Sequence, residues 1–126
     1  MLRLTTIALV FGLTLAACSS SGGDSTGIPV QDADLVAAGD VLYQANCAEC
    51  HGSDLRGTDK GPSHLSIVYV PGHHGDQAFV VAARVGVRSH HWDFGNMAPV
   101  DGLSDDDLTA IIAFVRENQR IQGFEP

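Results

Sequence analysis

Two cysteines and a histidine in the segment CAECHG, residues 47–52, are the side chains best suited to chemistry. Cys47 and Cys50 are three positions apart and His51 follows directly, in a chain that has three cysteines in all. On a helix, side chains at positions i, i+3 and i+4 project from one face. Such a group is able to hold a cofactor or a metal ion, to form a disulfide or to act as a redox pair.

Haem attachment explains this spacing better than its rivals do. A thioredoxin-like dithiol needs a βαβ setting, and the sequence shows no strand alternation. A disulfide across three residues closes a very small loop, and a zinc site needs further ligands, which the histidine pairs at 73–74 and 90–91 would have to supply. Cys-x-x-Cys-His is the attachment signature of c-type haem. We therefore predict one covalent haem c, with Cys47 and Cys50 bonded to its vinyl groups and His51 on the iron.

A second axial ligand is offered by HHWDFGNMAPV, residues 90–100. Met97 is the one methionine besides the initiator, and histidine with methionine gives haem iron a raised potential that suits electron transfer. Two filled axial positions exclude a substrate, which predicts an electron carrier and not an enzyme. A histidine in place of Met97 remains an alternative, as does an open sixth position. The residues that would supply the nitrogen ligand are His64, His73, His74, His90 and His91.

The first 17 residues read as a secretion signal. Arg3 precedes an apolar run over residues 4–17 that ends in small side chains, which is typical of a signal peptide. Fourteen apolar residues are fewer than the roughly 20 that a membrane-spanning helix needs. The segment LAAC resembles the lipobox of bacterial lipoproteins, and that resemblance implies that Cys18 becomes a lipid-bearing N-terminus on the extracytoplasmic face of a bacterial membrane.

Composition then divides the chain into three parts. Residues 1–17 form the predicted lipoprotein signal peptide, residues 18–33 a lipidated N-terminus and a flexible linker rich in Ser, Gly and Asp, and residues 34–126 one domain. The chain has 15 acidic and 7 basic residues, a formal net charge of −8. Such a balance argues against nucleic acid as a partner, and it is consistent either with docking on basic protein surfaces or with solubility alone.

The elements that must position the motif are helical, which predicts an all-α domain. Apolar side chains recur at helical spacing over 32–51, 75–87 and 103–119, and the third stretch has Ser104 as a candidate N-cap with acidic residues in its first turn. The long loops at 52–75 and 88–103 lack such a period. Loops of this length are unusual in a small domain unless they surround something, and we expect them to form the walls of a haem pocket.

With these features together, residues 34–122 resemble the class I c-type cytochromes, a family with a small all-α fold of three main helices and long loops around one covalent haem. The resemblance implies that Gly39 lies at a close helix crossing with Phe114. GPSHL is similar to the Gly-Pro-x-x-Leu segment of that family, which implies that the carbonyl of Pro62 orients His51. Met97 matches the distal ligand of the family, with Ala98 where a proline commonly follows.

The resulting expectation is a lipid-anchored monohaem electron carrier that serves redox proteins of a respiratory or related chain. We expect Trp92 to form part of the pocket wall, where its indole N–H would bond a haem propionate. The alternatives are a haem enzyme or a gas or redox sensor with a labile or open sixth site, and a metal-binding lipoprotein without haem. A peripheral metal site on the histidine pairs is a further hypothesis.

Overall fold

The structure is a computed structural model that describes residues 25–126. The predicted signal peptide and Cys18 lie outside the described residues. Within them the chain folds into α1 (Ala33–Asn46), α2 (Ala48–His51), the short 3₁₀ helix η1 (Ile67–Tyr69), α3 (Asp76–Val85) and α4 (Asp105–Gln122). The predicted all-α fold is confirmed, with no strand over this range. No helix of residues 25–126 is both long and apolar enough to span a membrane.

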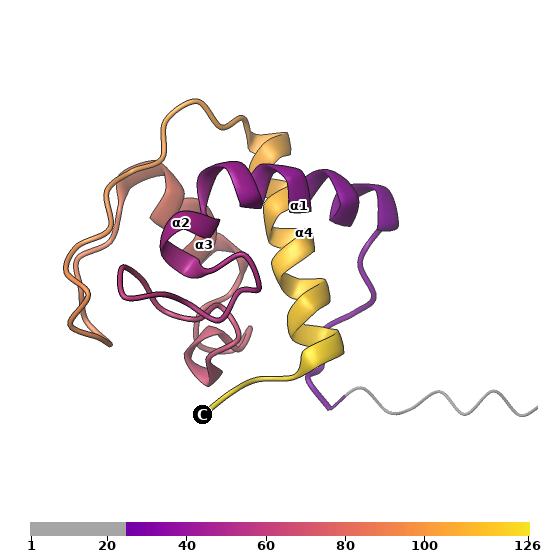
Figure 1. Ribbon diagram of the computed structural model, residues 1–126. Coiled ribbons are helices and arrows are strands. Elements are labelled where there is room, and N and C mark those ends of the chain that lie inside the picture. Colours follow the sequence, from indigo (N-terminus) through magenta and orange to yellow (C-terminus); the bar gives the residue numbers. More distant parts are fainter. Residues whose placement is uncertain (1–24) are drawn as a thin grey trace, which may run out of the picture.

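The helix expected over 32–51 is interrupted at Cys47. Asp32 caps the start of α1, since its carboxylate accepts hydrogen bonds from the backbone N–H groups of Asp34 and Leu35 at 3.0 and 3.1 Å. At Cys47 the backbone leaves the helical region, with φ −122°. The chain then starts the single turn of α2, which points away from the axis of α1 (Figure 1). Cys47 therefore lies at the bend itself, and Cys50 lies in the turn that follows it.

Helices α1 and α4 cross and form the centre of the domain (Figure 1). Their contact depends on Gly39, because a Cβ atom there would lie 1.9 Å from the carbonyl oxygen of Ala110 and 2.9 Å from Cβ of Phe114. The close crossing of Gly39 with Phe114 that the family resemblance implies is therefore present. Around it lies one apolar core. Its buried members are Tyr43, Leu55, Leu65, Ala83, Leu103, Leu108, Ile111, Phe114 and Val115.

Helix α4 follows the prediction from its sequence. Ser104 and Asp107 form a capping box, in which each side chain bonds the backbone N–H of the other residue. The predicted apolar stripe is buried, and the helix extends three residues beyond the expected end at 119, to Gln122. The longest helix thus provides a rigid wall on which the other elements pack.

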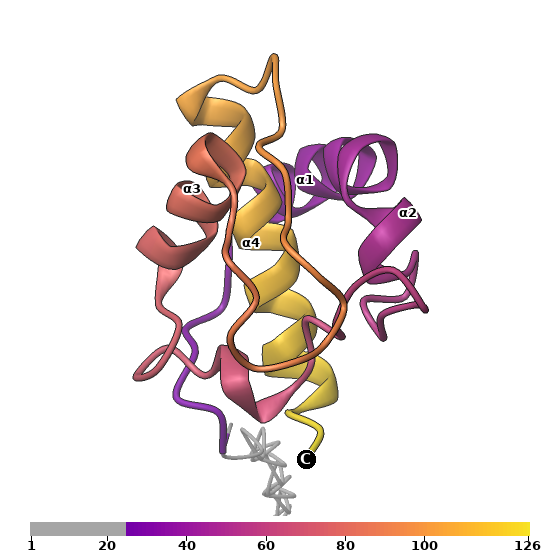
Figure 2. The same ribbon diagram turned by 90° about the vertical axis from the view of Figure 1, so that its left-hand side faces the viewer.

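Helix α3 packs beside α4 and continues into a long loop over residues 86–98 (Figure 2). Gly86 ends the helix with φ +76°, a conformation that favours glycine. The start and the end of the loop are then joined, because the backbone groups of Val87 and Met97 exchange two hydrogen bonds of 3.0 and 2.9 Å. The loop therefore returns toward the domain at Met97.

Arg116 of α4 connects the helical core to the chain between η1 and α3. Its side chain is 3% exposed, and its guanidinium donates to the carbonyl oxygens of Tyr69 and His74, to the Gln119 side chain and to the Asp76 carboxylate, each at 2.7 Å. A buried cation needs such partners. These bonds hold the turn over residues 69–74 at a fixed place against α4.

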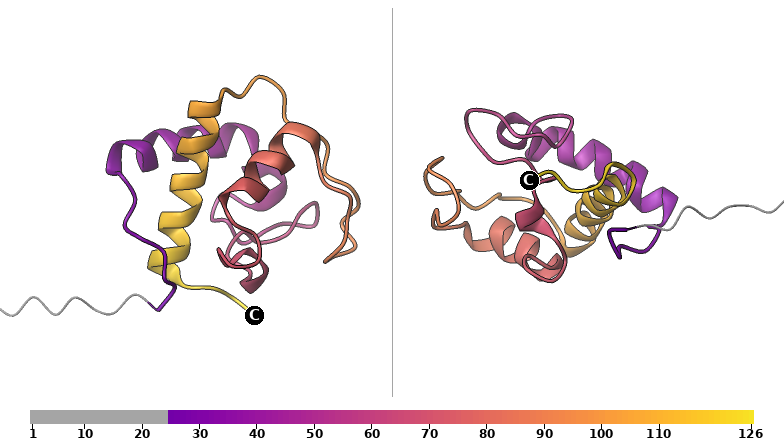
Figure 3. Two further views of the ribbon diagram at one scale, coloured as in Figure 1. Left: turned by 180° about the vertical axis from the view of Figure 1, so that it is seen from behind. Right: turned by 90° about the horizontal axis from the view of Figure 1, so that it is seen from below.

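Residues 25–32, which the sequence analysis assigned to the linker, lie along one end of α4 (Figures 1 and 3). Ile28 is 4% exposed, and the backbone N–H of Gln31 donates to the Glu117 carboxylate at 3.1 Å. Because most of this segment is polar, the sequence did not predict that Ile28 is buried. Residues 28–32 thus pack on the domain although they precede α1.

Candidate functional site

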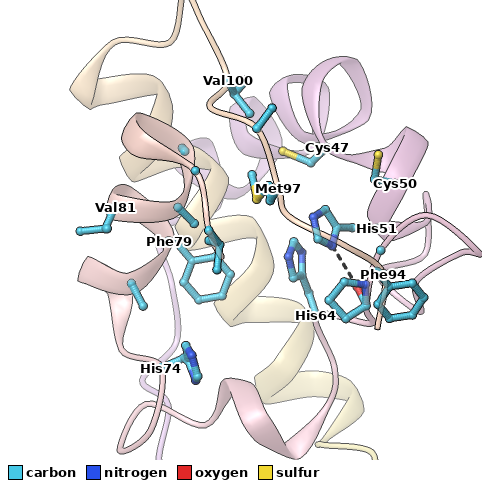
Figure 4. Close-up of a pocket in the computed structure, with 18 of the residues that line it drawn as sticks. Cys47, Cys50, His51, His64, His74, Phe79, Val81, Phe94, Met97 and Val100 are labelled. Carbon is cyan, nitrogen blue, oxygen red and sulfur yellow. Dashed lines mark hydrogen bonds between the residues drawn. The ribbon is translucent and has the colours of Figure 1, made fainter. Parts of the chain in front are cut away.

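A cavity of about 800 Å³ lies between α2, α3 and the loop over 86–98 (Figure 4). This volume is within the range of roughly 300–1,000 Å³ that is usual for cofactor and small-molecule sites. Cys47, Cys50 and His51 line it, as does Met97 from the loop. Much of the remaining wall is apolar and comes from α3, α4 and the segment after Met97. These residues include Phe79, Val81, Ala82, Val100, Leu108 and Ile111.

His51 is oriented by a hydrogen bond to the backbone. Its Nδ1 lies 2.9 Å from the carbonyl oxygen of Pro62, and because a carbonyl only accepts, Nδ1 carries the proton. The other ring nitrogen, Nε2, then keeps its lone pair for a metal. Burial lowers the pKa of His51, and the bond to Pro62 opposes this only in part. The imidazole is therefore neutral near pH 7, which is the form that binds iron.

The loop that carries Pro62 packs tightly on the motif. A Cβ atom at Gly61 would lie 3.0 Å from the carbonyl oxygen of Cys50 and 3.3 Å from Cε1 of His51. The hydroxyl of Thr58 donates to that same carbonyl oxygen at 2.7 Å. The segment 57–62 thus fixes the backbone of α2 as well as the imidazole ring.

The two thiols differ in their surroundings. Both are free in the structure, with Cys47 half-buried and Cys50 exposed. Burial, reinforced by the neighbouring Cys50, raises the pKa of the Cys47 thiol to about 11. The thiol is therefore protonated near pH 7, and addition of each S–H across a vinyl group of haem would give a thioether without loss of atoms.

Met97 reaches the same cavity from the far end of the loop over 86–98. Its backbone is held by Val87, and Gly86 allows the approach, because a Cβ at residue 86 would lie 2.5 Å from the carbonyl oxygen of Met97. Trp92, expected in the pocket wall, also lines the cavity and stacks on Tyr69, with ring centroids 6.0 Å apart. The sequence-predicted residues Cys47, Cys50, His51, Pro62, Trp92 and Met97 therefore all border one cavity.

Two residues of the site have surroundings that the sequence did not predict. His64, considered there only as an alternative ligand, is buried, stacks on His51 with centroids 4.1 Å apart and bonds the hydroxyl of Tyr43 through Nδ1 at 3.2 Å. Tyr69 packs edge-on against His64 and also contacts Phe79. Both come from a stretch without helical period. His64 occupies a variable position of the GPSHL segment, and no sequence pattern marks Tyr69. They form the floor of the cavity beside His51.

The chemistry of these donors fits a c-type haem. The cavity brings together two thiols, an imidazole with one nitrogen free for iron, a thioether and an apolar lining. A haem requires two thiols for covalent attachment, an axial imidazole and a largely apolar pocket. The described residues therefore supply each group that such a cofactor would use.

Comparison with known proteins agrees with this chemistry. The model of the cytochrome c family matches residues 36–119, a range that includes the cysteine pair, His51 and Met97. Cytochrome c-551 of Bacillus subtilis (strain 168) is 29% identical to this chain over 114 residues, which cover 89% of this chain and 90% of the relative.

Proposed function

Because the chain belongs to the cytochrome c family, we propose that it carries single electrons with His51 and Met97 as the two axial ligands of its haem. Membership makes it a monohaem class I c-type cytochrome, an electron-transfer protein and not an enzyme, with one covalent c-type haem. When bound, the haem supplies one-electron chemistry through ferric and ferrous iron. Its partners are redox proteins.

Each residue of the site has a role in this function. Cys47 and Cys50 would hold the cofactor, and the carbonyl of Pro62 keeps Nδ1 of His51 protonated, which leaves the lone pair of Nε2 available to the iron. The apolar side chains from α3 and α4 would keep water away from the iron. Lower solvent exposure and a thioether ligand both raise the reduction potential. The polypeptide thus sets the reduction potential, and with it the partners from which the haem can accept an electron and to which it can donate one.

The observation that carries the proposal is that the Cys-x-x-Cys-His motif and Met97 line one cavity. The backbone of Met97 is tied to Val87 by two hydrogen bonds, which hold this residue at the cavity. His64 stacks on His51 with ring centroids 4.1 Å apart, so its ring lies beside His51 and leaves no room for an iron atom between the two.

Carbon monoxide binding to the ferrous holoprotein tests the ligand. We expect the wild type to bind carbon monoxide slowly or not at all, and Met97→Ala to bind it at once with a lowered reduction potential. His90→Gln is the matched control from the same loop and should behave like the wild type. Immediate binding by the wild type would favour the alternative of a gas sensor or haem enzyme with an open sixth site. Loss of a ligand only in a histidine variant would contradict the role of Met97.

Covalent attachment has a separate test. A haem stain on a denaturing gel should detect the wild type and fail for the double variant Cys47→Ala, Cys50→Ala, because only thioether bonds survive denaturation. A colourless wild type from bacteria competent in haem attachment would support the metal-binding lipoprotein instead.

We also propose that Cys18 carries lipid and holds the domain on the extracytoplasmic face of a bacterial membrane. The support is the signal-like residues 1–17 and the lipobox-like LAAC. Several acyl chains anchor a protein firmly, since each buried methylene adds about 0.8 kcal/mol. We expect the wild type in the membrane fraction and Cys18→Ser in the soluble fraction. Membrane retention of Cys18→Ser would refute the lipid anchor.

A further inference from the structure

Three histidines meet outside the haem ligands. The side chains of His73, His74 and His91 each place a ring nitrogen within 4.8 Å of the others. The Nε2 atoms of His73 and His91 are 3.3 Å apart. Two nitrogens at about 2.05 Å from a tetrahedral metal ion are separated by about 3.3 Å. The spacing of this pair is therefore the one that a shared metal ion requires.

His73 and His74 lie on a turn that hydrogen bonds hold in place. Nδ1 of His74 donates to the carbonyl oxygen of Val68 at 2.9 Å, which leaves Nε2 free as a ligand. The backbone of the turn is also held, since the N–H groups of His73 and His74 both bond the carbonyl of Val70 and Arg116 donates to the carbonyl of His74 at 2.7 Å. Little rearrangement is needed on this side to receive an ion.

The third histidine comes from the loop over 86–98. His91 contacts both other rings, with centroids 5.2 Å from His73 and 5.1 Å from His74. The loop is braced internally, because the backbone N–H of Ser89 donates to the Asn96 side chain at 3.0 Å. The cluster thus joins two segments that are 17 or more positions apart in the chain.

The donor type narrows the choice of ion. All three ligands are imidazoles, which suit Zn²⁺, Cu²⁺ and Ni²⁺, whereas Ca²⁺ and Mg²⁺ prefer carboxylate and carbonyl oxygens. We propose that His73, His74 and His91 form a surface site for one late divalent transition-metal ion, with the fourth position left to water. The site is distinct from the haem iron, and its ion would tie the turn over 69–74 to the loop that carries Met97.

Zinc is the appropriate probe, since it has no redox chemistry and does not exchange electrons with the haem. We expect calorimetric titration of the full-length ferric holoprotein with Zn²⁺ alone to show one ion per chain beyond the haem iron. His73→Gln and His91→Gln should each weaken binding by at least about tenfold, because even an outer-shell change at a metal site costs 10–100-fold. His90→Gln, the neighbour outside the ligand set, should bind within about threefold of the wild type.

The zinc affinities of the wild type and the variants decide between the presence and the absence of this site. The proposal stands if the wild type binds one Zn²⁺, if the two ligand variants lose affinity and if H90Q retains it. The absence of binding to the wild type would overturn it, as would equal affinity in H73Q or H91Q, or a loss in H90Q as large as in H91Q. Circular dichroism spectra that match the wild type show that each variant is folded, and since neither Met97 nor His51 is altered, failure here leaves the electron-transfer proposal unaffected.

Discussion

The substitution Gly39→Ala should open the helix crossing at the centre of the domain. In the structure a Cβ atom at residue 39 would lie 1.9 Å from the carbonyl oxygen of Ala110 and 2.5 Å from its carbonyl carbon. A carbon–oxygen contact is normally about 3.3 Å or more, so α1 and α4 would have to separate by about 1.4 Å. The obstacle is backbone, which has no alternative rotamer to adopt.

The magnitude follows from two opposed effects. Overpacking of a core costs about 1–3 kcal/mol and at times more, and a gap of about 0.5–1 Å already forfeits a quarter to a half of a dispersion contact. A separation this large belongs at the upper end, about 3–4 kcal/mol. Alanine favours the helix over glycine by about 1 kcal/mol. We therefore expect a net loss of about 2–3 kcal/mol in the free energy of unfolding, and a fall of about 10–20 °C in Tm.

Thermal unfolding of the ferric holoprotein, followed by circular dichroism at helical wavelengths, measures this loss. Gly72→Ala is the matched control, because a Cβ at residue 72 meets nothing within 4 Å, and its stability should stay within about 1 kcal/mol of the wild type. A loss of less than about 1 kcal/mol in Gly39→Ala would show that α1 and α4 do not cross this closely, and it would refute the prediction.

Three further predictions concern the rest of the domain. Arg116→Met should cost about 2–4 kcal/mol in urea unfolding, since buried carbonyl groups lose their donor. Lys60→Met, which breaks an exposed ion pair with Glu49, should leave the urea midpoint almost unchanged. Ser104→Ala should cost about 1 kcal/mol in the same assay through loss of the capping box. Burial, with the charge of Arg116 as a smaller cause, holds the pKa of His64 well below 6.5, so the unfolded state takes up the proton first. The contribution of neutral His64 to the free energy of unfolding should be fully present above pH 6.5. Below pH 6.5 the free energy of unfolding should fall by up to about 1.4 kcal/mol per pH unit. H64Q should show a weaker dependence on pH, and an equal slope in both proteins would contradict this prediction.

Much of the fold was predictable because it depends on local chemistry. The capping box at Ser104 and the apolar period of α4 are properties of neighbouring residues, so the sequence alone predicts that helix closely. The Cys47–Cys50–His51 spacing likewise predicts a cofactor on one face, and the structure lines one cavity with all three residues. Family resemblance, and not periodicity, pointed to Gly39 and Pro62.

The remainder depends on contacts that no local pattern records. The break at Cys47 falls inside a continuous helical period. The burial of His64 and the partial burial of Tyr69 result from packing, which for His64 includes Tyr43 and Phe79, distant in the chain. The approach of His73 to His91 arises only when the turn before α3 and the loop after it fold toward each other. Pairs of histidines in separate loops are visible in a sequence, but their distance is not.

The docking of Ile28 beside α4 has a consequence for how the domain would be held at a bilayer. With Cys18 as the anchor proposed above, nine residues separate it from Ile28, which limits the distance between the two residues to at most roughly 35 Å. The chain enters the body on the side away from the loop that carries Met97 (Figure 1). The cytochrome would stay close to the lipid headgroups, with its haem pocket on the side of the domain away from the anchor. It would therefore meet redox partners near the membrane surface.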